Sequence, residues 1–219
     1  MRLRLYAVLP RKTAAVKFPS GLEREPLRIV RFGALAFVVG QARTFLPPVR
    51  ANLVAHDRVI SRIARVSQSI LPARFGMVID DAVRLKVLAL DRATEIGQAL
   101  EMVAGGEQMT VRLVVPQTGA RTVQTLRPAS GVEYLRARAA AARGPDVPEI
   151  RTVRAQMAPL VRAERVSLGQ EAGVLTIYHL IDRGRAARYR ALVRKMRKPG
   201  RIRVSGPFAP YAFVPETFG

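Results

Sequence analysis

Two histidines and one pair of adjacent carboxylates are the residues with the clearest potential for acid–base or metal chemistry. His56 and His179 each lack a second histidine at ligand spacing, and Asp80-Asp81 directly precedes an apolar-periodic segment. A carboxylate pair could bind a metal or exchange protons, but aspartate at this position is also a preferred helix N-cap. Both histidines stand among apolar residues, so we expect core or interface histidines rather than catalytic bases. We interpret the carboxylates as a helix cap.

The motifs of the common enzyme classes are absent from the sequence. It contains no G-x-S-x-G, no G-x-x-x-x-G-K-[ST], no H-E-x-x-H, and no G-x-G-x-x-G that opens a helix. It also contains no cysteine, which excludes disulfides, thiol nucleophiles and thiolate metal sites. We therefore expect no catalytic residue, no cofactor and no metal.

Basic residues dominate the charge of the chain. Its 219 residues include 37 Lys and Arg, of which 32 are arginine, against 16 Asp and Glu, so the net charge is +21. This balance suits an acidic partner, whether nucleic acid, an anionic membrane or an acidic protein. A solvated basic surface explains the same composition without any partner, and we favour that simpler interpretation.

A basic nucleic-acid-binding module is the main alternative function. RNA-recognition modules carry base-stacking aromatics in a K/R-G-F/Y-G/A-F-V-x-F/Y strand. The nearest match, RFGALAFV at 31–38, has its glycine out of order and lies in the N-terminal half. Nucleic-acid binding therefore depends on charge alone.

A basic amphipathic segment lies near the end of the chain. Residues 183–198, RGRAARYRALVRKMRK, contain eight basic residues, no acidic residue and an apolar stripe. Such a helix can lie on a membrane or bind an acidic partner. Because a crossover helix must bury its apolar face on a sheet, we favour packing within a domain, with a basic face in solvent.

The first half of the chain reads as short strands followed by two long helices. Apolar alternation predicts strands at residues 3–9, 27–33 and 34–40. Gly33 marks a tight turn or a bulge between the last two. The first helix opens at Pro47-Pro48 and is expected to end at Pro72, and the second runs from Asp81 to Gly105.

The second half follows the order β-α-α-β-β-α-β. The predicted elements are a strand at 109–115, helices at 131–143 and up to about 162, strands at 165–168 and 174–182, a helix at 183–198 and a strand at 201–205. This is the ferredoxin-like plan with its first crossover expanded into a helix pair. The sequence thus predicts an α+β protein with an N-terminal domain at 1–106, a modified ferredoxin-like domain at 107–206 and a tail at 207–219.

The tail combines prolines with aromatic residues. Its prolines block regular strand pairing, while Phe208, Tyr211 and Phe213 offer large apolar faces. We expect the tail to lie extended in a groove of the body, where it staples the two domains together. The alternative is that its aromatics form part of a partner-binding surface.

Several stretches together resemble the gas vesicle protein L/F family. They are, in the family's order, AHDRVISRI, ILPARFGMVI, SGVEYLRAR, YHLIDR and RVSGPFAPYAFVPE, and they spread over nearly the whole chain. The LP-x-RFG box and the GP-x-x-PY-x-FV tail are the most specific of these matches.

The resemblance implies a two-domain α+β accessory or minor structural protein of gas vesicles. It implies a noncatalytic role in assembly, through contacts with the small hydrophobic shell protein and with other accessory proteins. We accordingly expect a cytoplasmic, gas-vesicle location. No apolar run approaches the about 20 residues of a membrane-spanning helix.

The family's signature residues are interpreted mainly as a structural brace. In the LP-x-RFG box, Pro72 is expected to end the helix, a half-buried Arg74 to donate to open helix carbonyls, Phe75 to anchor in the core and Gly76 to permit the turn. The candidates for partner or tail contacts are Tyr134, Pro207, Phe208, Tyr211 and Phe213.

Overall fold

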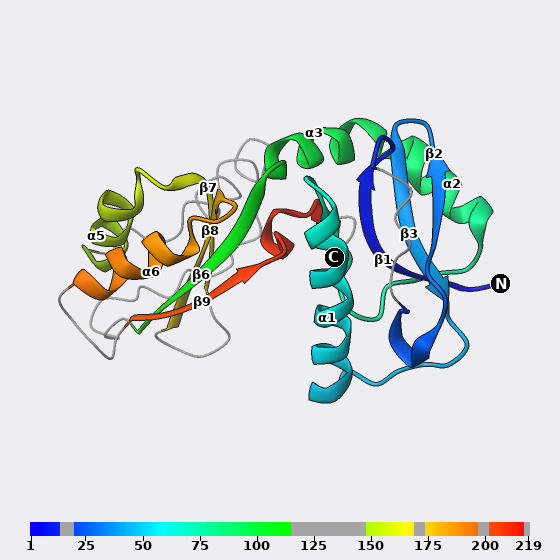
Figure 1. Ribbon diagram of the computed structural model, residues 1–219, viewed down its shortest axis with the longest axis horizontal. Helices are drawn as coiled ribbons and strands as arrows, with labels where there is room; N and C mark the ends of the chain where they lie inside the picture. Colours follow the sequence, from blue (N-terminus) through cyan, green and yellow to red (C-terminus); the bar gives the residue numbers. More distant parts are fainter. Residues whose placement is uncertain (14–19, 115–147, 169–173, 197–201, 217–219) are drawn as a thin grey trace, which may run out of the picture. The chain divides into compact units, whose positions relative to one another are not determined.

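The computed structural model describes residues 1–13, 20–114, 148–168, 174–196 and 202–216, which form two units (Figure 1). Unit 1 comprises Met1–Glu107 together with Phe208–Gly219, and unit 2 comprises Gln108–Pro207. The chain leaves unit 1 within strand β6 (Gly106–Val114) and returns within β9 (Ile202–Phe208). Unit 2 is therefore an insertion between two segments of unit 1. Each unit combines helices with a sheet, which confirms the α+β class.

Unit 1 is built on a five-stranded sheet with the order β2-β3-β1-β4, in which β5 also pairs with β1. The strands are β1 (Leu3–Pro10), β2 (Arg28–Phe32), β3 (Leu35–Gln41), β4 (Leu71–Pro72) and β5 (Val78–Ile79). β1 and β3 run antiparallel and are buried along nearly their whole length. The β2–β3 hairpin turns at Gly33, whose φ of +53° lies in the left-handed region that glycine adopts readily. The turn predicted there is confirmed.

The helices of unit 1 are α1 (Arg50–Val66), α2 (Ala82–Asp91) and α3 (Ala93–Val103). The helix predicted to continue to Pro72 ends at Val66, because the Ser67 hydroxyl donates to the Ser69 carbonyl at 2.5 Å and a local turn replaces the helix. The second predicted helix is two helices, since Arg92 departs from helical geometry at φ −116° and ψ 13°. No proline or glycine marks that break, so an apolar period alone could not reveal it.

Unit 2 contains a four-stranded sheet with the order β7-β8-β6-β9. Its other elements are α5 (Pro148–Met157), β7 (Val161–Leu168), β8 (Val174–Asp182) and α6 (Ala186–Lys195). Numbered by their order within the unit, the strands lie as 2-3-1-4, with a helix in each crossover, which is the ferredoxin-like arrangement predicted from the sequence. The helix predicted at 131–143 lies outside the described residues.

The border between α5 and β7 differs from the prediction. The helix expected to reach about residue 162 ends at Met157, and the strand expected at 165–168 already begins at Val161. Pro159 lies between them and cannot continue an α-helix, because its ring removes the N–H donor and clashes with the preceding turn.

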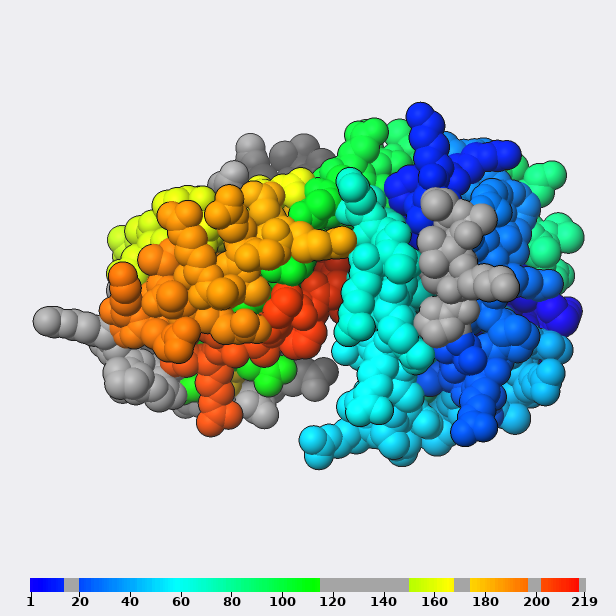
Figure 2. All heavy atoms as spheres, viewed as in Figure 1, coloured from blue at the N-terminus to red at the C-terminus, as the bar shows by residue number. Residues whose placement is uncertain are grey.

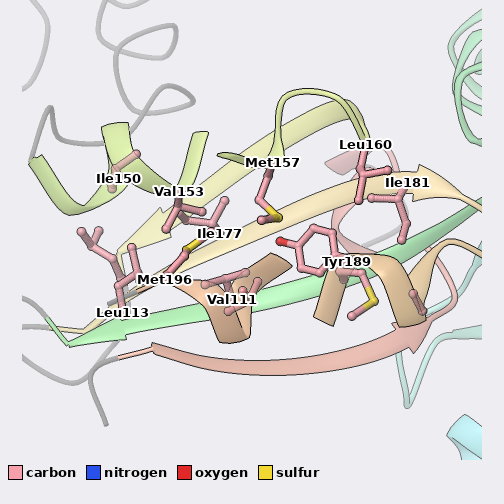
Figure 3. Close-up of a cluster of buried hydrophobic side chains, with 14 residues drawn as sticks. Val111, Leu113, Ile150, Val153, Met157, Leu160, Ile177, Ile181, Tyr189 and Met196 are labelled. Carbon is pink, nitrogen blue, oxygen red and sulfur yellow. The ribbon is translucent and has the colours of Figure 1, made fainter. Parts of the chain in front are cut away.

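The core of unit 2 fills the space between its sheet and the helices α5 and α6 (Figure 3). β6 contributes Val111 and Leu113, α6 contributes Tyr189, and Met196 follows directly after α6; these side chains point into the cluster. Among the described residues of the chain, no helix is both long enough and apolar enough to cross a bilayer.

Candidate partner-binding surface

The LP-x-RFG box lies where the chain rejoins the sheet of unit 1. Leu71 and Pro72 form β4 against β1, and the Ala73 N–H donates to the Tyr6 carbonyl at 2.8 Å. Proline is tolerated here because β4 is an edge strand, where a missing N–H breaks no ladder on the outer side. The box is therefore part of the sheet rather than the end of α1.

Aromatic rings secure the box from the side of α1. The buried His56 ring stacks on Tyr6 at a centroid distance of 5.5 Å and meets the Phe75 ring edge-on at 5.7 Å. Its Nε2 donates to the Ala73 carbonyl at 3.0 Å. Burial lowers the pKa of His56, so the neutral ring is the form that fits this site. As the sequence indicated, His56 is a core residue.

The turn of the box carries Arg74 outward. Gly76 has a φ of +86°, and the Met77 N–H donates to the Arg74 carbonyl at 3.3 Å. The Arg74 side chain is exposed and has no hydrogen-bond or ion-pair partner in the described part of the chain. The sequence predicted a half-buried guanidinium that donates to the open carbonyls at a helix end. The structure differs, because α1 has already ended at Val66.

A buried polar cluster lies on the same sheet, and the sequence did not reveal it. Glu25 Oε1 accepts from Arg4 Nη1 at 2.9 Å and from the Tyr6 hydroxyl, which itself accepts from the Leu22 N–H at 2.7 Å. Burial, with the hydrogen bond to Glu25, raises the pKa of Tyr6. A Cβ at Gly40 would lie 2.5 Å from Glu25 Cδ, so a larger residue there would have to displace the buried Glu25 carboxylate. These residues stand far apart in the sequence, which is why no local pattern indicates the cluster.

The tail packs within unit 1. Phe213 is 1% exposed, Ala209 and Val214 are also buried, and the Tyr211 hydroxyl donates to Asp57 Oδ1 on α1 at 3.4 Å. The backbone is not extended throughout, since Tyr211–Phe213 form a 3-10 turn that the Phe213 N–H closes onto Pro210.

The remaining candidate contact residues have different surroundings. Pro207 is exposed and Phe208 is 37% exposed, so both remain available to a partner. Tyr134 lies outside the described residues.

Helix α2 carries apolar side chains on two opposite sides. Leu85 and Ala89 are buried against the unit, whereas Val83, Val87 and Leu90 are 71%, 42% and 59% exposed. These three residues, here called the α2 outer stripe, follow one another at steps of four and three and so share one helical face. Figure 2 shows the teal-green α2 atoms at the surface of unit 1. The exposed Arg84 and Lys86 lie on either side of this stripe, so it is a narrow apolar band on the outer side of α2.

The start of α2 explains the carboxylate pair. Asp81 is its N-cap, and its Oδ1 accepts from the Arg84 N–H at 2.8 Å, which confirms the predicted helix cap. Within the described ranges, no three His, Asp or Glu side chains come together as metal ligands would.

Unit 2 contains a hydrogen-bonded chain of four polar residues. The Tyr189 hydroxyl donates to His179 Nδ1 at 2.6 Å, and His179 Nε2 donates to Glu164 Oε2 at 2.9 Å. Glu164 Oε1 accepts from Arg154 Nε at 2.8 Å. Tyr189 and His179 are both 0% exposed, so this histidine is a core residue and not a base open to a substrate.

Comparisons with known proteins agree along nearly the whole chain. The family model for the gas vesicle synthesis protein GvpL/GvpF matches residues 3–215. A gas vesicle protein F from a Streptomyces strain is 30% identical over 228 residues, covering 94% of this chain and 93% of that protein.

Two solved structures share the fold. The gas vesicle protein GvpF of an Anabaena species superposes with a TM-score of 0.72 at 16% identity, covering 98% of this chain and 96% of that one. GvpF of Microcystis aeruginosa gives 0.71 at 16% identity, with 97% and 98% covered. At 16% identity the structures establish the fold. The family model and the Streptomyces relative together establish the family. The chain belongs to the GvpL/GvpF family of gas vesicle synthesis proteins.

Proposed function

We propose that this protein is a noncatalytic assembly factor or minor structural component of gas vesicles, acting through contacts with the vesicle shell protein and other accessory proteins. Membership of the family supports a role in gas vesicle formation. The absence of catalytic motifs from the sequence and the burial of both histidines support action through binding.

The α2 outer stripe carries this proposal. Its three side chains remain 42% to 71% exposed although the opposite side of the same helix is fully buried. Covering them would contribute about 3 kcal/mol at the usual value for apolar burial. That is roughly a hundredfold in affinity, enough to matter in an assembly contact.

A hydrophobic partner fits this stripe better than a charged one. Val83, Val87 and Leu90 present no polar group of their own, and a short helical stripe of this kind suits an apolar helix laid along it. The small hydrophobic shell protein is the partner of that chemistry implied by the family resemblance. We therefore propose the α2 outer stripe as the shell-protein contact.

Substituting the exposed residues tests the proposal. The double variant Val83→Ser, Leu90→Ser should retain the melting temperature of the wild type, because both side chains are mostly exposed, and should bind purified shell protein at least about tenfold more weakly. Binding is measured by surface plasmon resonance and vesicle formation by complementation in cells.

A matched control is available on α1. Val54 and Val66 are 42% and 46% exposed on that helix, so the double variant Val54→Ser, Val66→Ser also replaces two exposed apolar residues, at a different place. It should leave shell-protein binding unchanged. Equal binding by the α2 double variant and the wild type would contradict the proposed contact.

A further inference from the structure

The positive charge of the protein is concentrated in unit 2. Residues 108–207 include 20 basic and 6 acidic residues, a net charge of +14, whereas the remainder has 17 and 10, a net charge of +7. Within unit 2, the segment 183–207 contains ten basic residues and no acidic one. Helix α6 lies in this segment.

Helix α6 separates its apolar and basic side chains completely. Ala186, Tyr189, Val193 and Met196 are buried in the core of unit 2. The opposite side, here called the α6 basic face, consists of exposed side chains, and its cations are Arg188, Arg190, Arg194 and Lys195. Figure 2 shows α6, in orange, at the surface of unit 2.

The cations of this face have no acidic partner in the part of the chain that the structure describes. In the described part of unit 2, the arginine–carboxylate ion pairs join Arg154 to Glu164 and Arg162 to Asp182, and neither involves α6. On α6, Arg190 donates to the Gly206 carbonyl, and Arg194 Nε donates to the Arg190 carbonyl at 3.4 Å. The charges of the face are therefore not neutralised by the described residues.

Part of this arrangement costs the helix stability. Arg190 and Arg194 are like charges at i and i+4, which repel on a helix surface. Arg185, at the N-cap, and Arg188, in the first turn, also oppose the helix dipole, which favours negative charge at that end, whereas Arg194 and Lys195, in the last turn, complement it. Residues that disfavour their own helix, as the like charges and the N-terminal arginines of α6 do, are expected where a surface serves binding.

We infer that the α6 basic face binds an acidic segment of a partner protein. Insertion of α6 into a membrane interface does not fit, since it needs an exposed apolar face and that of α6 is buried. Single-stranded nucleic acid is held largely by aromatic stacking, yet the one aromatic residue of α6, Tyr189, is 0% exposed. Carboxylates need only charge and hydrogen-bond donors, which arginine supplies. The inference rests on the proposed function only in taking a protein as the partner.

Charge removal on the full-length chain tests the inference. The triple variant Arg188→Gln, Arg194→Gln, Lys195→Gln keeps good helix formers in place. The probe is a fluorescently labelled helical peptide with glutamates at i and i+4. At low salt the triple variant should bind it about tenfold more weakly than the wild type, because several exposed ion pairs act together.

The matched control removes three charges from α1. Arg58, Arg62 and Arg65 are also exposed cations on a helix, so their triple replacement by glutamine changes the net charge equally. This variant should bind the peptide nearly as well as the wild type. Equal weakening by both triple variants would show non-specific attraction and overturn the inference.

Two further probes decide the class of partner. A short oligothymidylate and vesicles of phosphatidylserine are titrated in parallel with the peptide. Tighter binding of either probe than of the peptide, lost in the α6 variant, overturns the inference in favour of nucleic acid or membrane. The α6 variant should retain shell-protein binding and the α2 double variant should retain peptide binding, so that either proposal can fail alone.

Discussion

The residues of the LP-x-RFG box divide into those that hold the fold and one that faces solvent. Ala73 links β1 and α1 through its backbone, and Phe75 packs on the His56 ring, whereas Arg74 extends away from the unit. The residue types of the box are evident in the sequence, but their directions depend on where α1 ends. A shift of that end from Pro72 to Val66 places the box in a strand and turns the guanidinium outward.

Substitutions in the box should therefore differ in their effect on stability. Phe75→Ala should lower the free energy of unfolding by about 2 kcal/mol, because a half-buried ring is lost from the contact with His56. Arg74→Ala should change it by less than about 0.5 kcal/mol, as exposed substitutions usually do. Urea denaturation measures both. If Arg74→Ala destabilised the protein as much as Phe75→Ala, the interpretation of Arg74 as a structural brace would be correct.

At the scale of elements, the polar chain of unit 2 connects α5 and α6 to the sheet. Arg154 on α5, Glu164 on β7, His179 on β8 and Tyr189 on α6 each contribute one member. The sequence placed His179 on a buried strand position correctly. It did not indicate the partners, because Glu164 and Tyr189 stand 15 and 10 residues away on elements brought near only by the fold.

This chain predicts a pH dependence of stability. Burial alone would raise the pKa of Glu164, but the hydrogen bonds from His179 and Arg154 outweigh it and hold the pKa below the ordinary 4.5. A depressed carboxyl pKa stabilises the fold above the unfolded value and loses that contribution as pH falls through the folded value. The melting temperature of the wild type should therefore exceed that of Glu164→Gln at pH 7, with a gap that closes below about pH 4.5.

Comparing the wild type with Glu164→Gln removes the loss of stability that acid causes in both through their other titratable groups. Both carry the same other carboxylates, so their difference reports the ionisation of Glu164 alone. Calorimetric melts at several pH values between neutrality and about pH 3 provide the measurement. A gap that stays constant over this range would mean that the charge of Glu164 contributes nothing to stability.

At the scale of the whole molecule, unit 1 is discontinuous in sequence. Its sheet and helices come from the first 107 residues, and Phe208–Gly219 complete it after the whole of unit 2. The ferredoxin-like order of unit 2 was predictable, because strands and helices alternate with clear apolar periods. The return of the tail to unit 1 was less predictable from the sequence. Ala209, Tyr211 and Phe213 pack against unit 1, but they follow no helical or strand period that would indicate this contact.

The tail should be a major determinant of the stability of unit 1. Phe213→Ala should cost about 3–5 kcal/mol, the usual range for a buried phenylalanine, because its side chain is 1% exposed. Phe208→Ala is the control from the same segment, with 37% exposure, and should cost less than about 1 kcal/mol. Chemical denaturation gives both values, and hydrogen exchange should show increased opening in β1 and β4 for Phe213→Ala. Similar costs for the two variants would mean that the tail does not belong to the core.

The insertion of unit 2 also sets an order of events during synthesis. Residues 208–216 leave the ribosome only after all of unit 2, whose translation takes roughly 5–20 s at ordinary elongation rates. During that interval the first 107 residues lack the segment that covers part of their apolar core. A nascent chain at this stage exposes surface that a hydrophobic protein could bind, so chaperone protection would be needed most before the final residues emerge.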